Sequence, residues 1–307
     1  MLSIVIPFYN GEKWLPHLLQ SLTHSNAQGS LSIALEIIIV IDSVQTPQHI
    51  VEQFAVNNIQ SPNIQYKIIK NQINLGVARS RDIGMAYATG EYITFIDQDD
   101  YVSDKYCCEL YKALRTHADL YMVNGIIRNT LSGKEVPVYY HMRRPTLKQL
   151  IYGNNILSPS FWITRTAFLR DNSIHFTLPF DDFQGVDDWY YSLQIFLHTP
   201  LKIELVHTPL IYYCIHDANF SHNLQMQFDG SIAVLQHLCE RVTPAQKKWI
   251  RQRIKTFQFS KTFYLHSKKQ AFIKHPILFL QFLHHYLYDK NRLIRFLHRT
   301  LIDMRIR

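Results

Sequence analysis

Short apolar runs alternate with helix-like segments through the first hundred residues. Runs at residues 3–6, 36–41, 65–69 and 91–96 are rich in β-branched residues, and they predict buried strands. Segments between them place apolar residues at helical spacing, and they predict helices from about residue 12, over 46–57 and over 77–88. This strand–helix alternation predicts an α/β fold, with a mainly parallel sheet covered by helices on both faces.

The pattern loosens after residue 100. A helix is predicted over residues 103–117, a strand over 120–128, and a hairpin turn at Ser132-Gly133. Further helices are predicted over 147–152, 166–171 and 187–198. Beyond residue 225 everything reads as helices, separated at Pro244, Ser267 and Pro276.

The net charge of +8 is unevenly distributed. Residues 247–307 hold 15 Lys and Arg against two acids, so the rest of the chain is mildly acidic. Four cysteines are too few for a secreted disulfide scaffold. The apolar start of the chain is short and stopped by Pro7, unlike a signal peptide, and no later run reaches the length of a membrane span. These features predict a cytoplasmic protein whose body and tail meet different partners.

Acidic residues follow the apolar strands. Asp42 follows the second strand, and the string Asp97-Gln98-Asp99-Asp100 follows the fourth. Ligands of open α/β sheets bind beyond the carboxyl ends of the strands. Crowded carboxylates need a counter-charge, and Mg²⁺ or Mn²⁺ suits oxygen ligands. The alternative is a solvated acidic turn, or a helix cap before the helix after Ser103.

Several ordered motifs resemble those of family 2 glycosyltransferases, which have the GT-A fold. They are SIVIPFYNGEKWL at the start, then EIIIVID, GVARSRDIG and GEYITFIDQDD, followed by GVDDW at 185–189 and YCIHDANFS at 213–221. The resemblance covers about residues 1–222. It implies a nucleotide-sugar-binding half at 1–100 and an acceptor-binding half at 101–224. Residues 225–307 would form a basic helical C-terminal extension.

The resemblance also assigns roles to single residues. It implies that Pro7 and Tyr9 flank the nucleotide base, with Asn10 and Glu12 nearby. Asp42 would contact the uracil or its ribose, and Asp97 and Gln98 would border the ribose. The remaining assignments are Arg81 in the nucleotide pocket, with Arg79 as the competing candidate, and Asp99 with His216 at the metal.

Asp188 is the predicted catalytic base. Inverting transfer needs one carboxylate near the acceptor hydroxyl to take its proton. Asp187 would begin the helix, where an acid favours the helix dipole, and could contact the acceptor. Two alternatives remain: Asp187-Asp188 could simply cap a helix, or Asp181 or Asp182 could supply the base.

The chain departs from the family pattern in four places. The paired acid after strand two is Ile41-Asp42, and the usual Gly-Ser is Ser43-Val44. Asp82 replaces the Asn that follows the motif arginine, and Cys214 replaces a later Arg. The first acid of the family's Glu-Asp pair is Asp187.

Aromatic residues and the basic tail suggest where further partners bind. Trp162 or Trp189 could be a platform for the acceptor sugar, with core packing as the alternative. The basic tail could dock on an anionic membrane surface, which suits lipid-linked acceptors. The alternatives are a charged face of a helical subdomain or dimer contact, and nucleic-acid binding, which no recognised motif supports.

Together these features predict a metal-dependent, inverting hexosyl- or N-acetylhexosaminyltransferase of the bacterial surface-polysaccharide type. Its donor would be a nucleotide diphosphate sugar, with UDP-sugar favoured, and its acceptor a glycan or lipid-linked oligosaccharide. We expect it in the cytoplasm, peripheral on the cytoplasmic face of the membrane. The alternative function is a non-catalytic protein that binds sugar nucleotides or polyanions.

Overall fold

The computed structural model describes residues 1–28, 31–153, 157–180, 185–198, 200–216, 224–265 and 276–277. The chain divides into two compact units, Met1–His222 and Asn223–Arg307. The finer division of the first unit at residue 100 stays a prediction.

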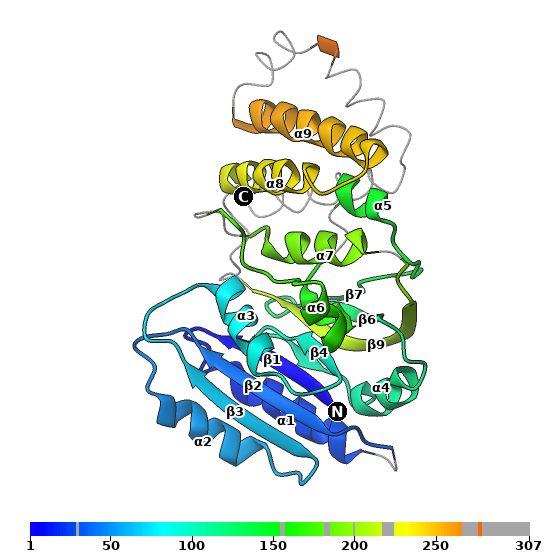
Figure 1. Ribbon diagram of the computed structural model, residues 1–307. Coiled ribbons are helices and arrows are strands. Elements are labelled where there is room, and N and C mark those ends of the chain that lie inside the picture. The colour runs from blue at the N-terminus through cyan, green and yellow to red at the C-terminus, as the bar shows by residue number, and fades with distance from the viewer. Residues whose placement is uncertain are drawn as a thin grey trace. The chain divides into compact units, whose positions relative to one another are not determined.

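Four strands form the first half of the sheet, in the order β3-β2-β1-β4 (Figure 1). All three ladders in this half are parallel. Every residue of the two central strands is buried, which explains their unbroken apolar runs. The strands are β1 (Leu2–Phe8), β2 (Leu35–Ile41), β3 (Ile64–Lys70) and β4 (Tyr92–Phe95).

The helices between these strands lie on both faces of the sheet, as predicted. The chain moves outward from β1 to β3 and then returns to β4 on the other side of β1. Right-handed crossovers therefore place the first two helices on one face and the third on the opposite face (Figure 1). The helices are α1 (Leu15–Ala27), α2 (Gln48–Asn58) and α3 (Val77–Tyr87).

The second half of the sheet continues in the order β8-β6-β9-β5, with β7 paired to β6. The sequence pattern predicted β6 and its hairpin but did not predict β5, β8 or β9. The longest of these, β9, carries Pro209 in its interior, which normally argues against a strand. The structure accommodates the proline where the β6–β9 register shifts, opposite Asn124. The strands are β5 (Tyr101–Val102), β6 (Leu120–Asn129), β7 (Glu135–Pro137), β8 (Trp162–Arg165) and β9 (Ile203–Ile215).

Shorter helices complete the first unit. The helix predicted from residue 103 is α4, which begins at Tyr106. The helices at 147–152 and 166–171 match the prediction, and α7 ends one residue earlier than predicted. The elements are α4 (Tyr106–Leu114), α5 (Leu147–Tyr152), α6 (Thr166–Asp171), α7 (Asp187–Leu197) and a 3₁₀ turn, η1 (Pro159–Phe161).

The second unit contains α8 (Leu224–Cys239) and α9 (Pro244–Leu265), which pack on each other. Phe228 and Phe257 meet with ring centroids 6.2 Å apart, and Lys261 pairs with Asp229. Within the described residues, no helix combines the length and apolar character that crossing a membrane requires. The helices predicted beyond Ser267 and Pro276 lie largely outside the described residues.

Candidate functional site

Three strand ends meet at the carboxyl edge of the sheet. Backbone hydrogen bonds continue past the strands themselves, from Asp42 N to Phe8 O (2.8 Å) and from Ile96 N to Val5 O (3.0 Å). The segments after β1, β2 and β4 therefore lie side by side. This is the edge at which open α/β sheets bind their ligands, and the predicted site residues Tyr9, Asp42 and Asp97 all follow its strands.

Arg81 is the centre of the site. Its Nη1 donates to Asp187 Oδ2 (2.8 Å) and Asp188 Oδ1 (2.6 Å), and its Nη2 donates to Asp97 Oδ1 (2.6 Å). The guanidinium lies 5.2 Å from the centroid of the Phe176 ring, and only 3% of the residue is exposed. One cation thus joins the acidic turn after β4 to the first turn of α7.

The cluster shifts the pKa values of Arg81 and Asp188. Burial would lower the pKa of Arg81, but Asp188, Asp97 and Asp187 together raise it above its ordinary value. The pKa of Asp188 is raised well above its usual range by burial, and Asp187 and Asp97 raise it further against the opposing effect of Arg81. A carboxyl group with a raised pKa and 30% side-chain exposure has the character of a general base.

Asp99 lies at the other side of the acidic turn. His216 Nε2 is 2.7 Å from Asp99 Oδ2, and the His216 ring stacks on Trp14 with centroids 4.7 Å apart. Lys13 lies 4.1 Å above the Trp14 ring. The pKa of Asp99 is raised by burial and by Asp97, while His216 opposes the shift. The structure therefore brings the two predicted metal residues together.

The structure places Trp14 differently from the sequence prediction. Its apolar character suggested a position within the first helix, but α1 begins at Leu15 and Trp14 is its N-cap residue. Trp14 is partly buried, and one face of its ring stacks on His216. Sequence spacing gave no signal for this stacking contact, since the two residues lie about 200 positions apart.

Asp100 anchors the acidic turn to β9. It is 2% exposed, and its Oδ1 accepts a hydrogen bond from Cys214 N (2.9 Å). Burial raises its pKa well above the ordinary value, and Asp97 and Asp99 add to the shift. A structural role for this carboxyl explains why the acidic string continues past Asp99, and the sequence analysis did not predict it.

Asp42 is engaged by the loop before α3. Its carboxylate accepts hydrogen bonds from Leu75 N, Gly76 N and Asn71 Nδ2, each at 2.8 Å, and the residue is 4% exposed. Gly76 has φ +84°, a conformation that favours glycine. Asp42 thus fixes the loop before α3, and its predicted contact to the base or ribose stays a prediction.

Asp82, which stands where the family has Asn, binds the chain at Phe176 and Thr177. Its carboxylate accepts hydrogen bonds from Phe176 N (2.7 Å), Thr177 N (2.8 Å) and the Thr177 hydroxyl (2.5 Å). These bonds place Phe176 against the Arg81 guanidinium. A carboxylate can accept all three bonds, so the substitution supports the arginine cluster.

The loop after β1 is fixed by side-chain hydrogen bonds. The Ser43 hydroxyl donates to Asn10 Oδ1 (2.6 Å), and the Thr46 hydroxyl donates to Glu12 Oε1 (2.7 Å). Pro7 lies buried within β1. The loop therefore brings together Asn10 and Glu12, which were both predicted to lie near the base.

The structure corrects the two tryptophan assignments. Trp162 and Trp189 are each 2% exposed. Trp162 packs against Phe196, and Trp189 Nε1 donates to Leu150 O (2.8 Å). Both rings belong to the core, because neither presents a face on which a sugar could stack. The alternative bases Asp181 and Asp182 lie outside the described residues.

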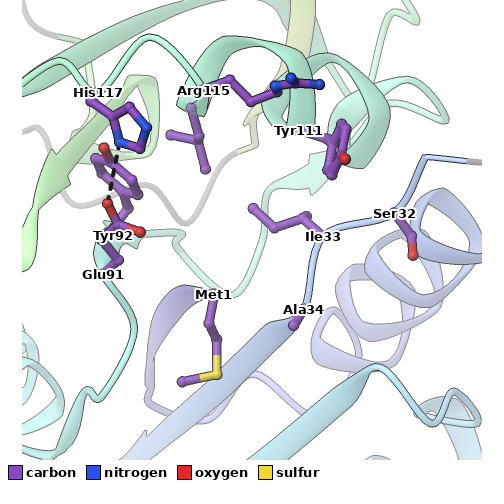
Figure 2. A pocket seen from close by; sticks show the side chains of 10 residues that line it. Met1, Ser32, Ile33, Ala34, Glu91, Tyr92, Tyr111, Arg115 and His117 are labelled. Atoms are coloured by element: carbon purple, nitrogen blue, oxygen red, sulfur yellow. Dashed lines mark ion pairs between the residues drawn. The ribbon is translucent and has the colours of Figure 1, made fainter.

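A cavity of about 460 Å³ opens at the opposite end of the sheet (Figure 2). Figure 2 shows Met1 and Ala34 facing Tyr111 and Arg115 across it, with His117 paired to Glu91 at 3.7 Å on one side. Its described lining includes none of the predicted site residues. The cavity therefore lies apart from the candidate site.

The donor set fits a divalent cation that also binds substrate. Asp99 and His216 would supply one carboxylate oxygen and one imidazole nitrogen. Within the described parts of the chain, no three His, Cys, Asp or Glu side chains gather as they would around a metal held by protein alone. Mg²⁺ and Mn²⁺ are commonly held by one or two side chains together with substrate phosphates, so two ligands suffice here.

A parallel sheet edge that carries acidic residues beyond its strand ends is the place where open α/β folds bind nucleotides. The family model described as "Glycosyl transferase family 2" matches residues 3–173, more than half of the chain. This chain therefore belongs to glycosyl transferase family 2, and the family predicted from the sequence motifs is confirmed.

Curated relatives include several bacterial glycosyltransferases. The chain is 25% identical over 218 residues to the poly(ribitol-phosphate) beta-N-acetylglucosaminyltransferase TarS of Staphylococcus aureus, a match that covers 69% of this chain. It spans about a third of the TarS length, since the match covers 35% of that protein. It is also 24% identical over 243 residues to the putative glycosyltransferase EpsH of Bacillus subtilis, covering 76% of this chain and 67% of EpsH.

Solved structures confirm the GT-A fold. The S. aureus TarS 1–349 complex with UDP-GlcNAc has a TM-score of 0.65 at 22% identity, covering 88% of this chain and 77% of that one. The mannosyltransferase PcManGT of Pyrobaculum calidifontis, in complex with GDP-Man and Mn²⁺, has a TM-score of 0.60 at 14% identity. That match covers 98% of this chain and 84% of PcManGT.

Proposed function

We propose that this protein transfers a sugar from a nucleotide diphosphate donor to a glycan or lipid-linked acceptor, with inversion at the anomeric carbon. The observation that carries this proposal is the Arg81 cluster, in which one buried guanidinium joins Asp97 on the donor side to Asp188 on α7. This cluster fixes a carboxylate of raised pKa beside the nucleotide edge, which is the arrangement that a single displacement needs.

Asp188 acts as the general base. Arg81 holds its Oδ1, and the other carboxylate oxygen takes the proton of the acceptor hydroxyl. The acceptor oxygen bonds to the anomeric carbon as the bond from that carbon to the diphosphate oxygen breaks. The nucleotide diphosphate leaves from the opposite face of the sugar. Asp187, which is bound to the same Arg81 nitrogen, is proposed to orient Asp188 and to border the acceptor.

Asp99 and His216 would hold a Mn²⁺ or Mg²⁺ ion together with the diphosphate. The ion would neutralise the charge that develops on the leaving group. Asp99 Oδ2 and His216 Nε2 form a hydrogen bond of 2.7 Å, so the two groups lie near enough to bind one ion in its place. The Mn²⁺ in the PcManGT complex, which has the same fold, also supports a divalent cation.

UDP-sugars are the proposed donors, with N-acetylhexosamine as the sugar to test first. TarS, which is named a beta-N-acetylglucosaminyltransferase, has been solved with UDP and with UDP-GlcNAc, and this supports the choice. The base would lie between Pro7 and Tyr9, near Asn10, Glu12 and Asp42. Asp97 would border the ribose.

The basic face of α9 is proposed to dock on an anionic membrane surface, where lipid-linked acceptors are found. Lys248, Arg251 and Lys255 are exposed and spaced three and four residues apart, so they lie on one side of the helix. Each basic residue near an anionic surface contributes roughly 1 kcal/mol. We propose a peripheral position on the cytoplasmic face of the membrane.

The test is a screen of nucleotide sugars for donor hydrolysis and transfer, with and without Mn²⁺. We expect activity with a UDP-sugar that requires the metal, and we expect its loss in Asp99→Ala and Asp188→Asn. The matched control is Asp171→Asn, because Asp171 is an exposed aspartate at the end of α6. Full activity of Asp188→Asn would refute the base assignment. UDP binding without any turnover would favour a non-catalytic binding protein instead.

A further inference from the structure

The Gln98 side chain forms a reciprocal pair of hydrogen bonds with the main chain of Tyr9. Tyr9 N donates to Gln98 Oε1, and Gln98 Nε2 donates to Tyr9 O, each at 2.9 Å. This is the pattern by which two facing residues pair in an antiparallel sheet, here made by one side-chain amide. Gln98 stands between Asp97 and Asp99, so the pair joins the acidic turn to the loop after β1.

The loop is built around this amide. A Cβ atom at Gly11 would lie 2.1 Å from Gln98 Oε1 and 2.3 Å from Gln98 Cδ, so only glycine leaves room for the side chain. Asn10 adopts φ +48°, an uncommon conformation that the Ser43 hydroxyl supports by its bond to Asn10 Oδ1. Gly11 therefore makes room for Gln98, and Asn10 supplies the turn beside it.

The pair of hydrogen bonds between Gln98 and Tyr9 acts as a clamp. This clamp fixes the backbone of Tyr9 but leaves its ring exposed. Tyr9 is 51% exposed, which is high for a tyrosine whose main chain is bound on both sides. An exposed aromatic ring on a fixed backbone provides a flat surface for a planar ligand such as a nucleobase. The Gln98 amide uses one N–H and one acceptor position of its oxygen for the Tyr9 main chain, so its orientation is fixed by that contact.

We propose that Gln98 is a positioning residue that holds Tyr9 where its ring stacks on the base of the donor. This inference rests on the proposed function, because it requires a nucleotide at this edge. It explains why a glutamine stands inside the acidic string, since only an amide offers both the donor and the acceptor that the Tyr9 main chain needs. The clamp acts on the base and leaves the diphosphate site unchanged.

The test measures binding of UDP and of inorganic pyrophosphate, each with Mn²⁺, by calorimetry. Gln98→Met keeps the length of the side chain but removes both hydrogen bonds. We expect the Kd for UDP to rise about tenfold, the loss expected for two partly exposed hydrogen bonds. The Kd for pyrophosphate should stay unchanged. Exchange of the Tyr9 amide proton, followed without ligand, should accelerate in the same variant.

Two further variants complete the test. Gly11→Ala displaces the Gln98 side chain without altering it, and it should reproduce the selective loss of UDP binding. It also stands in if Gln98→Met does not fold. Gln53→Met is the matched control, since Gln53 is exposed on α2 and should leave both affinities unchanged.

The possible outcomes separate the two proposals. Unchanged UDP binding in Gln98→Met or in folded Gly11→Ala overturns the clamp. Equal loss of UDP and pyrophosphate binding also overturns it, because Gln98 would then act on the acidic turn. Wild-type protein that binds neither ligand contradicts the proposed function itself.

Discussion

Arg81 neutralises three carboxylates that the fold has drawn out of water. Its side chain is 4% exposed, and Asp187 beside it is 8% exposed. Arg81→Met keeps most of the side-chain volume but removes the cation. The carboxylates of Asp97, Asp187 and Asp188 would then face one another without a counter-charge. We expect a marked decrease in the free energy of unfolding, larger than the loss of packing at Arg81 would cause.

The magnitude follows from the burial of the cluster. Removing one partner of a buried ion pair costs about 3–5 kcal/mol. Asp97 and Asp188 keep about 30% side-chain exposure and are partly solvated, so the lower end applies, about 3 kcal/mol. For a unit of this size each kcal/mol lowers the melting temperature by about 2–4 °C. The expected decrease is therefore about 6–12 °C.

The loss should depend on pH. Without Arg81, which opposes the shift, the folded-state pKa of Asp188 rises further above its unfolded value. Such a group binds more protons in the folded state, so the free energy of unfolding falls as pH rises between the two values. The difference between Arg81→Met and wild type should thus be larger at pH 8 than at pH 5.5.

The assay is thermal denaturation followed by circular dichroism at both pH values. Arg79→Met is the matched control, because Arg79 lies on the same helix and is exposed. It should melt within about 2 °C of wild type, as surface substitutions do. If Arg81→Met melts with the control at both pH values, the cluster does not stabilise the fold and the reasoning is refuted.

Three further outcomes are expected. Burial would raise the pKa of Glu36, but hydrogen bonds from Lys67, Ser3 and Thr89 lower it to about 2. The charged form therefore stabilises the fold above about pH 4.5, and this stabilisation is lost as the pH falls toward 2. In urea denaturation, Glu36→Gln should lose about 3 kcal/mol at pH 7 and clearly less at pH 3, and equal losses would contradict the pKa shift. Trp14→Ala should weaken Mn²⁺ binding about tenfold, because it removes the ring that orients His216, whereas Trp14→Phe should keep most of the Mn²⁺ affinity. Titration calorimetry measures both variants, and equal effects would exclude stacking. Changing Lys248, Arg251 and Lys255 together to Gln should reduce sedimentation with anionic vesicles but not with neutral ones, and unchanged pelleting would exclude membrane docking by this face.

The first half of the fold was predictable because its strands are buried on both faces. β1 and β2 are fully buried, so their sequences are short, mainly apolar runs rich in Ile and Val, and their length and β-branched residues distinguish them from helices. The later strands carry weaker signals. β9 is exposed at several positions and contains Pro209, and β5 and β8 are very short. Their pairing depends on distant partners, which a local pattern does not reveal.

The candidate site was partly predictable from the order of its sequence motifs. Motif order pointed to Asp97, Asp99, Asp188 and His216, and the structure brings each beside another predicted residue. Residues that act through geometry gave no such signal. The role of Asp82 becomes visible only when the chain at Phe176 folds against it, 94 positions later. The role of Gln98 requires the main chain of a residue 89 positions earlier.

The connectivity of the sheet also determines when the site can form. Arg81 pairs with Asp187 and Asp188, which lie 106 and 107 positions further along the chain. Asp99 pairs with His216, 117 positions further along. Contacts this distant in sequence form late in folding, because a long loop must close first. During synthesis the first four strands leave the ribosome before Asp187, Asp188 and His216 have been added to the chain. The machinery for sugar transfer is thus completed only by chains that have been synthesised and folded through β9.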